Sequence, residues 1–233
     1  MGIGDIRFTV LEVVQEVFRK LGLDQPSSLS ANKLSIQMID FINDVCDDLS
    51  DFGNWQETMV TANVTAVAGQ RDYLINTSAN VKNIGDIYLS TRTGPLRNIT
   101  VQDMRRFVSA NGTPSQYTVF GTDISSGNPV LRMRPVPVSG QGAGGIFSIL
   151  YWVRAPNYST SDGASLIPFP GQIVITGTLA KAILNESGGS PTDRYTATYR
   201  DYLQARKEAL NRFNGDTGWD VSFSPSLTSR RRR

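Results

Sequence analysis

The sequence predicts an α+β fold in which helices from both ends of the chain form one bundle and an antiparallel β domain is inserted between them. Apolar residues recur at helical spacing near both ends, and they alternate with a period of two in the middle. Periodicity is lost after residue 214, which predicts an extended C-terminal tail. We therefore expect a helical bundle domain of residues 1–54 and 168–214, a β-rich domain of residues 55–167 and a tail of residues 215–233.

Two amphipathic helices are expected at the start of the chain. Between Asp5 and Leu21 the apolar residues follow spacings of three, four and seven, and Gly22 supplies the left-handed residue that commonly ends a helix. A second helix is expected from an N-cap at Ser30 to Gly53. Because the connection between them is short, we expect the two helices to pack as an antiparallel hairpin.

The pattern changes to strands after residue 54. Residues 60–66 alternate between apolar and polar side chains, and residues 68–72 form the expected turn into a return strand at Tyr73. Further strands are expected at 84–90, 115–121, 129–137 and 146–156. Pro135 and Pro137 predict that the strand containing them lies at an edge or carries a bulge.

Helical patterns interrupt and then follow the strands. A short helix is expected at Thr100, with Asp103 three residues later as in a capping box, and it should end at residues 111–112. Residues 172–186 are mostly small and apolar, which is typical of a helix central in a bundle. A long amphipathic helix is expected from Thr192 to about residue 214. Both terminal helix pairs then have apolar faces that need a shared core.

Composition argues against several kinds of function. The chain has 39% hydrophobic and 19% charged residues, as soluble globular proteins do, and no apolar run approaches the roughly 18 residues that span a bilayer. Histidine is absent, which removes Ser-His and Cys-His nucleophiles and the commonest zinc ligand. The single cysteine, Cys46, has apolar neighbours at helical spacing and is interpreted as a buried packing residue. We expect no catalytic, cofactor-binding or metal site.

Five landmarks occur in a fixed order along the chain. They are Trp55 ahead of "VAGQRDYLI" (67–75), then "GTPSQYTV" (112–119), "LRMRPVP" (131–137) and "ILYWVRAP" (149–156). With helices on both sides, this order resembles the head-to-tail adaptor (connector) proteins of short-tailed bacteriophages, over roughly residues 5–213. The chain departs from that family at Ile75–Asn76, where the family often has Leu-Pro.

The resemblance implies a structural virion protein rather than an enzyme. Such adaptors form a homo-oligomeric ring, typically a dodecamer, between the portal protein and the tail nozzle protein, and double-stranded DNA passes through it without sequence-specific binding. The implied location is the head-tail junction of the virion, after assembly in the host cytoplasm and without a membrane. Two alternatives stay open: another tail or neck component, or a host-attachment module that binds a receptor or glycan.

Five aspartates lie along the side of the second expected helix that faces away from its apolar residues. They are Asp40, Asp44, Asp47, Asp48 and Asp51. A solvated helix face is the plainest interpretation. A second is that this acidic stripe lines the bore of a ring, where negative charge keeps passing DNA from adhering. A metal or acid–base site is a third, although paired catalytic carboxylates need a cleft that the sequence does not predict.

The tail carries the other candidate surface. Trp219, Val221 and Phe223 have i, i+2, i+4 spacing, which puts them on one side of an extended segment and suits strand addition to a partner. The end of the tail supplies four of the 23 basic residues, and without them the formal charge falls from +2 to −2; these residues are Arg230, Arg231, Arg232 and Arg233. A portal-docking strap is one interpretation, and a disordered or solvated end is another.

Overall fold

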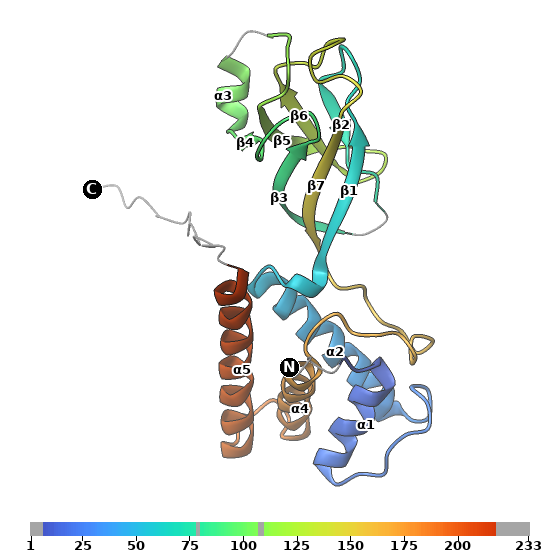
Figure 1. Cartoon of the computed structure of the whole chain (residues 1–233). Coiled ribbons are helices and arrows are strands. Elements are labelled where there is room, and N and C mark those ends of the chain that lie inside the picture. The colour runs from blue at the N-terminus through green and yellow to red at the C-terminus, as the bar shows by residue number, and fades with distance from the viewer. Residues whose placement is uncertain (1–6, 78–79, 107–109, 218–233) are drawn as a thin grey trace, which may run out of the picture. The chain divides into compact units, whose positions relative to one another are not determined.

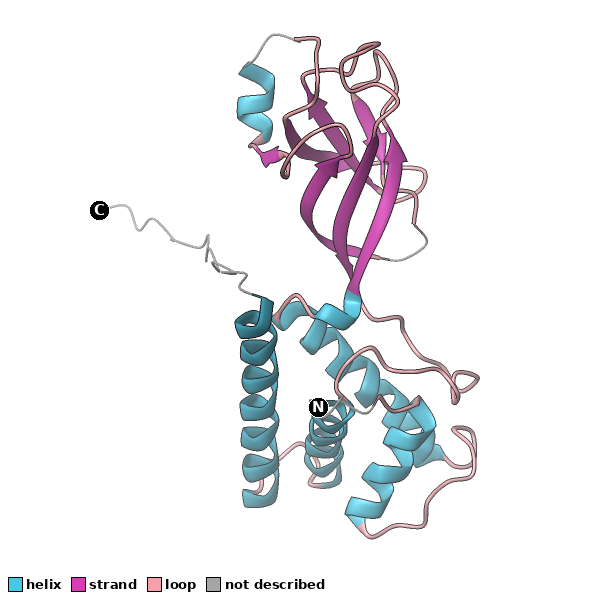
Figure 2. Cartoon of the chain, in the orientation of Figure 1, coloured by secondary structure: helices cyan, strands magenta, loops and turns pink. Residues whose placement is uncertain are grey.

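The chain contains five α-helices and seven strands in the described residues of a computed structural model, which are 7–77, 80–106 and 110–217. Helices lie at both ends of the chain and the strands lie between them (Figure 2), which confirms the α+β class. The chain divides into two compact units, the first from residues 1–45 and 159–233 and the second from residues 46–158. The division after residue 45 falls inside the second helix, whereas the sequence predicts a boundary at residue 54. Side-chain periodicity reports the local structure of a segment, and the units are defined by contacts between segments.

The first unit is built around α4 (Gly171–Glu186), which packs against α1 (Val10–Leu21) and α5 (Asp193–Thr217) (Figure 1). Apolar residues are buried on most sides of α4, as expected for a central helix. The most extensive helical contact of α1 is with α4, and the predicted antiparallel packing of α1 against α2 (Lys33–Phe52) stays a prediction. Helices from the two ends of the chain therefore share one core.

Capping side chains set where the first two helices begin. Thr9 and Glu12 form a reciprocal capping box, with the Glu12 N–H donating to Thr9 Oγ1 at 3.2 Å, so α1 begins at Val10 rather than near Asp5. Gly22 ends it with φ 75°, as predicted. The α2 helix begins at Lys33 because Asn32 Oδ1 accepts the Ser35 N–H at 2.8 Å, and Ser30 is not the cap.

The second unit holds two sheets. One has the order β1 (Met59–Thr65), β7 (Ile146–Val153) and β3 (Val81–Leu89), with both pairings antiparallel. The other has the order β2 (Asp72–Leu74), β6 (Pro129–Arg134), β5 (Gln116–Thr122) and β4 (Arg97–Asn98). Their inward side chains form one apolar core that includes Tyr73, Leu131, Met133, Phe147 and Ile149. The short α3 (Val101–Arg106) packs against β5.

Strand pairing differs from the sequence prediction in three places. The segment at Tyr73 is not the return strand of β1: β1 pairs with β7, and β2 pairs with β6 in the other sheet. The strand before Pro135 is internal, because β6 ends at Arg134 and both prolines follow it. The β4–β5 pairing is parallel, whereas the other pairings between strands are antiparallel. The Thr100–Asp103 capping bonds are present, as predicted, and the described part of α3 reaches Arg106, after which residues 107–109 lie outside the described residues.

The chain returns to the first unit by pairing with the start of α1. The Val10 and Leu11 N–H groups donate to the Ser165 and Gly163 carbonyls at 3.0 and 3.1 Å. At the other end α5 continues to Thr217, so the prediction that the tail starts at residue 215 is wrong by those helical residues. Residues 218–233 lie outside the described residues. No helix in the described part of the chain is long and apolar enough to cross a membrane.

Candidate assembly surfaces

The five aspartates of the acidic stripe are all exposed on α2, as predicted: Asp40, Asp44, Asp47, Asp48 and Asp51. Two of them form ion pairs with residues far along the chain. Asp44 accepts from Lys181 Nζ on α4 at 3.0 Å, and Asp51 accepts from Arg154 after β7 at 2.6 Å. The Asp44 and Asp51 side chains are each 62% exposed, so both pairs are surface pairs of small stabilising effect.

The same ion pairs reduce the net charge of the stripe. Five carboxylates with two cations beside them leave a moderately negative face rather than a dense anionic cluster. Such a face repels phosphate weakly and locally, and salt screens it within about 10 Å at 0.1 M ionic strength. Sequence reasoning missed Lys181 and Arg154, since no local pattern links residues that lie more than a hundred positions from their partners.

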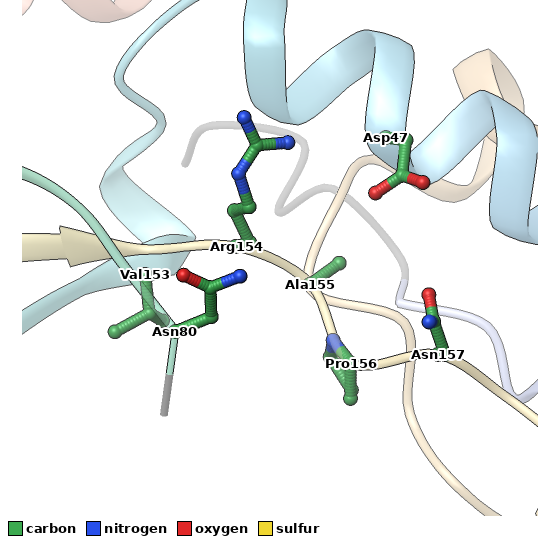
Figure 3. A pocket seen from close by; sticks show the side chains of 7 residues that line it. All are labelled: Asp47, Asn80, Val153, Arg154, Ala155, Pro156 and Asn157. Carbon is green, nitrogen blue, oxygen red and sulfur yellow. The ribbon is translucent and has the colours of Figure 1, made fainter. Parts of the chain in front are cut away.

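A pocket of about 690 Å³ in the second unit borders the stripe at Asp47. Figure 3 shows Asp47 projecting from α2 across from the segment that carries Arg154, Ala155, Pro156 and Asn157. Its lining mixes amides, one carboxylate and one guanidinium with small apolar groups, and Asn80 and Val153 complete it. These groups can donate and accept hydrogen bonds to a neighbouring molecule.

A smaller pocket of about 320 Å³ lies in the first unit between α2 and α4. The Asp44–Lys181 pair forms part of its wall, with Phe41 and Leu184 as the main apolar groups. In the described residues, no group of three or more Asp, Glu, Cys or His side chains is placed to hold a metal ion.

The second sheet has a charged cluster on the side away from the core. Arg132 donates two hydrogen bonds to Asp72, at 2.6 and 2.7 Å, and its guanidinium lies 3.3 Å from the centre of the Phe120 ring. The hydrogen bonds that Arg132 donates to the Asp72 carboxylate raise the pKa of Arg132 above its usual value. Bidentate pairing and stacking fix this arginine, so it serves the sheet rather than a ligand.

Several buried polar groups have perturbed pKa values that packing explains. Burial raises the pKa of the Cys46 thiol to about 12, which confirms the buried cysteine expected from the sequence. Burial also raises the pKa of Tyr117 to about 12, and its hydroxyl donates to the Gly85 carbonyl at 2.7 Å. Burial lowers the pKa of Lys82, whose Nζ donates to the Gly53 carbonyl at 2.7 Å.

Exposed apolar side chains are the remaining surface feature of the second unit. They lie along the strands and at the turns between them: Met59, Val60, Val67, Leu74, Tyr88, Val119, Ile124 and Ile146. Tyr88 is the only aromatic residue among them, at 42% exposure. The other predicted site residues, Trp219, Val221, Phe223 and Arg230 to Arg233, lie outside the described residues.

Comparison with known proteins places this architecture in a family. None of the curated proteins compared with the chain matches it. The model of one family, described as SU10 adaptor protein, matches residues 8–229, which includes both units and most of the tail. The match covers nearly the whole chain and agrees with the landmark order that resembles phage connectors. The chain therefore belongs to the SU10 adaptor protein family, a family of phage head-to-tail adaptors.

Proposed function

We propose that the chain is one subunit of a closed ring that joins the portal protein to the tail and surrounds the passage for double-stranded DNA. The family match over residues 8–229 carries this proposal. Rings of identical subunits need two different surfaces that fit each other, because head-to-tail contacts are heterologous. One chain with a helical unit and a strand-rich unit supplies such different surfaces.

In this proposal the acidic stripe faces the DNA passage. Its carboxylates are exposed, and the cations paired with Asp44 and Asp51 lower the negative charge of the stripe without neutralising it. A weakly negative wall disfavours phosphate contacts, so the duplex slides without binding. The tail, with Trp219, Val221, Phe223 and Arg230 to Arg233, is proposed to extend from this ring toward the portal. No catalytic role is part of the proposal.

A host-attachment role finds no favouring observation. Receptor- and glycan-binding surfaces typically gather exposed aromatic side chains, and in the described residues of the second unit only Tyr88 is of this kind. The exposed side chains are instead mostly aliphatic and lie along strands, as at a subunit interface.

Electron microscopy of the purified chain mixed with portal-bearing, tail-less particles tests the ring. We expect a ring of density, typically twelve-fold, on the portal vertex. Attachment of single copies at scattered positions on the particle would contradict the proposal.

The DNA-facing stripe has a separate test. The double variant Asp40→Asn, Asp47→Asn removes charge while it leaves the Asp44–Lys181 and Asp51–Arg154 pairs intact. We expect rings to form normally and genome ejection to slow at low salt, with recovery as salt is added. The matched control is Asp24→Asn, Asp201→Asn, which neutralises two exposed carboxylates of the first unit that lie off α2. Equal ejection rates for both variants at low salt would contradict the proposed contact with DNA and show that the stripe is an ordinary solvated helix face.

A further inference from the structure

The edge strand β1 is unusually unprotected. Proteins normally shield sheet edges with charged side chains, prolines, bulges, short strands or covering loops, because an open edge accepts strands from other chains. The seven residues of β1, Met59–Thr65, contain no charge and no proline, and their register with β7 has no bulge. Within the described residues β1 pairs with β7 only.

The other three sheet edges carry such protection. The β3 edge has two register shifts, and the Leu96 N–H covers it by donating to the Ile87 carbonyl at 2.7 Å. The hydroxyl of Tyr117 occupies a further β3 carbonyl, that of Gly85. In the second sheet the edge strands β2 and β4 have only three and two residues. The contrast singles out β1.

The core beneath β1 is also incompletely covered. Val60, Ala62 and Val64 share the face of β1 that meets Tyr151, Ile149 and Phe147 of the core. Yet Val60 is 38% exposed, and Ala62 and Val64 are only partly buried against that core. An added strand with apolar side chains at every second position would cover these three residues and complete the layer.

The chain itself contains a segment with this pattern. Trp219, Val221 and Phe223 repeat the i, i+2, i+4 spacing of the three β1 residues, and they follow directly after α5 ends at Thr217. Five extended residues span about 17 Å, which fits within the roughly 23 Å of a seven-residue strand. We propose that residues 219–223 of one copy add as a strand to the β1 edge of the neighbouring copy. This inference rests on the ring proposed above.

Strand addition of this kind is heterologous, because the tail of each copy and the β1 edge of the next are different surfaces. It therefore propagates around a ring, whereas β1–β1 pairing is self-complementary and stops at a dimer. Main-chain hydrogen bonds provide affinity and the three apolar side chains provide register. With residues 219–223 on the neighbouring copy, the arginines at 230–233 are the part of the tail that remains to contact the portal, which narrows the portal-docking role proposed above for the whole tail.

A peptide titration tests the acceptor edge. The probe is a fluorescent peptide of residues 216–226, and the protein is the full chain with Trp219→Ala and Phe223→Ala, so that its own tail does not compete. We expect saturable binding that weakens at least tenfold when the protein also carries Thr61→Glu and Thr65→Glu. Both threonines are exposed on the face opposite the core, where the carboxylates would meet Asp220 of an added strand.

The charge-matched control is Thr93→Glu with Thr122→Glu, two exposed threonines away from β1, and it should bind as the parent does. A peptide with alanine at 219 and 223 should not bind, and this arm involves no change to the folded protein. Absence of saturable binding, or equal binding by the β1 variant and its control, overturns the inference.

A mixing experiment identifies the neighbouring copy as the acceptor. Chains with Thr61→Glu and Thr65→Glu keep the tail, and chains with Trp219→Ala and Phe223→Ala keep the β1 edge. Light scattering should give a monomer for each alone and a one-to-one complex for the mixture. No complex in the mixture, or a dimer of the tail variant alone, overturns the assignment. Peptide binding without portal attachment would instead leave the inference standing and refute the proposed function.

Discussion

Replacing Gly177 by alanine should destabilise the first unit, although alanine is the better helix former. A Cβ atom at position 177 would lie 2.9 Å from both Val45 Cγ1 and Tyr202 Cε2. Val45 and Tyr202 are 1% and 3% exposed, so neither side chain can move into solvent. Overpacking of this kind costs about 1–3 kcal/mol, against a gain of about 1 kcal/mol in helix propensity. We expect a net loss of up to about 2 kcal/mol in the free energy of unfolding.

Urea unfolding followed by the helical signal measures this loss. For a domain of this size, a change of 1 kcal/mol also corresponds to about 2–4 °C in the melting temperature. Gly163→Ala is the matched control, because a Cβ there meets its nearest atoms at ordinary distances of 3.7–3.8 Å. Combining Gly177→Ala with Val45→Ala should cost less than the two single losses added together, since the second change makes room for the first. A Gly177→Ala protein about 1 kcal/mol more stable than the wild type, as helix propensity alone predicts, would refute the close approach of the three helices.

Three further predictions concern single side chains. Thr9→Ala should cost about 1 kcal/mol of stability in urea unfolding because it removes the α1 cap, whereas Thr9→Ser should keep most of it; equal losses would exclude the capping box. Arg132→Lys should cost about 1 kcal/mol because it loses the bidentate contact with Asp72 and the stacking on Phe120, while the exposed Arg97→Lys control stays within about 0.5 kcal/mol. Burial raises the pKa of Cys46 from an ordinary 9.0 to about 12, so the thiol of the unfolded chain loses its proton at a lower pH than the thiol of the folded chain. The stabilising effect of the buried, protonated thiol is therefore complete below pH 9 and falls above it by up to about 1.4 kcal/mol per pH unit. The stability difference between wild type and Cys46→Ala should therefore shrink between pH 9 and 10.5, and a constant difference would contradict the burial of the thiol.

Local patterns were sufficient to predict where most helices and strands lie, because side-chain periodicity is set by the backbone of each element. The ends of α1 and α2 were harder, since periodicity continues past a helix start and only the cap decides it. At α1 the deciding pair, Thr9 and Glu12, is visible in the sequence as Thr-x-x-Glu. At α2 several neighbouring polar residues compete, and only the structure shows that Asn32 rather than Ser30 bonds to the helix.

Local patterns do not predict which strands pair, for a different reason. The turn at residues 68–72 looks like a hairpin connection, but Tyr73 and Leu74 pair with Leu131 and Val130 instead of with β1. The sheet in which a strand lies depends on which apolar faces cover the common core, and that is a property of the whole unit. The same holds for the candidate site: exposure of the five aspartates follows from helical spacing, while their partners Lys181 and Arg154 come from other elements.

Charge placement and edge protection together distinguish the edges of the two sheets. Where the second sheet ends, short strands and the fixed Arg132–Asp72 pair leave little backbone for another chain to join. Where the first sheet ends, β1 offers seven regular residues with no charge. A sequence that only had to fold would gain solubility from one lysine in β1, as sheet edges usually do. Its absence beside a core that is left partly uncovered is understandable if the edge is covered only after assembly, which makes β1 a surface that belongs to the ring rather than to the single chain.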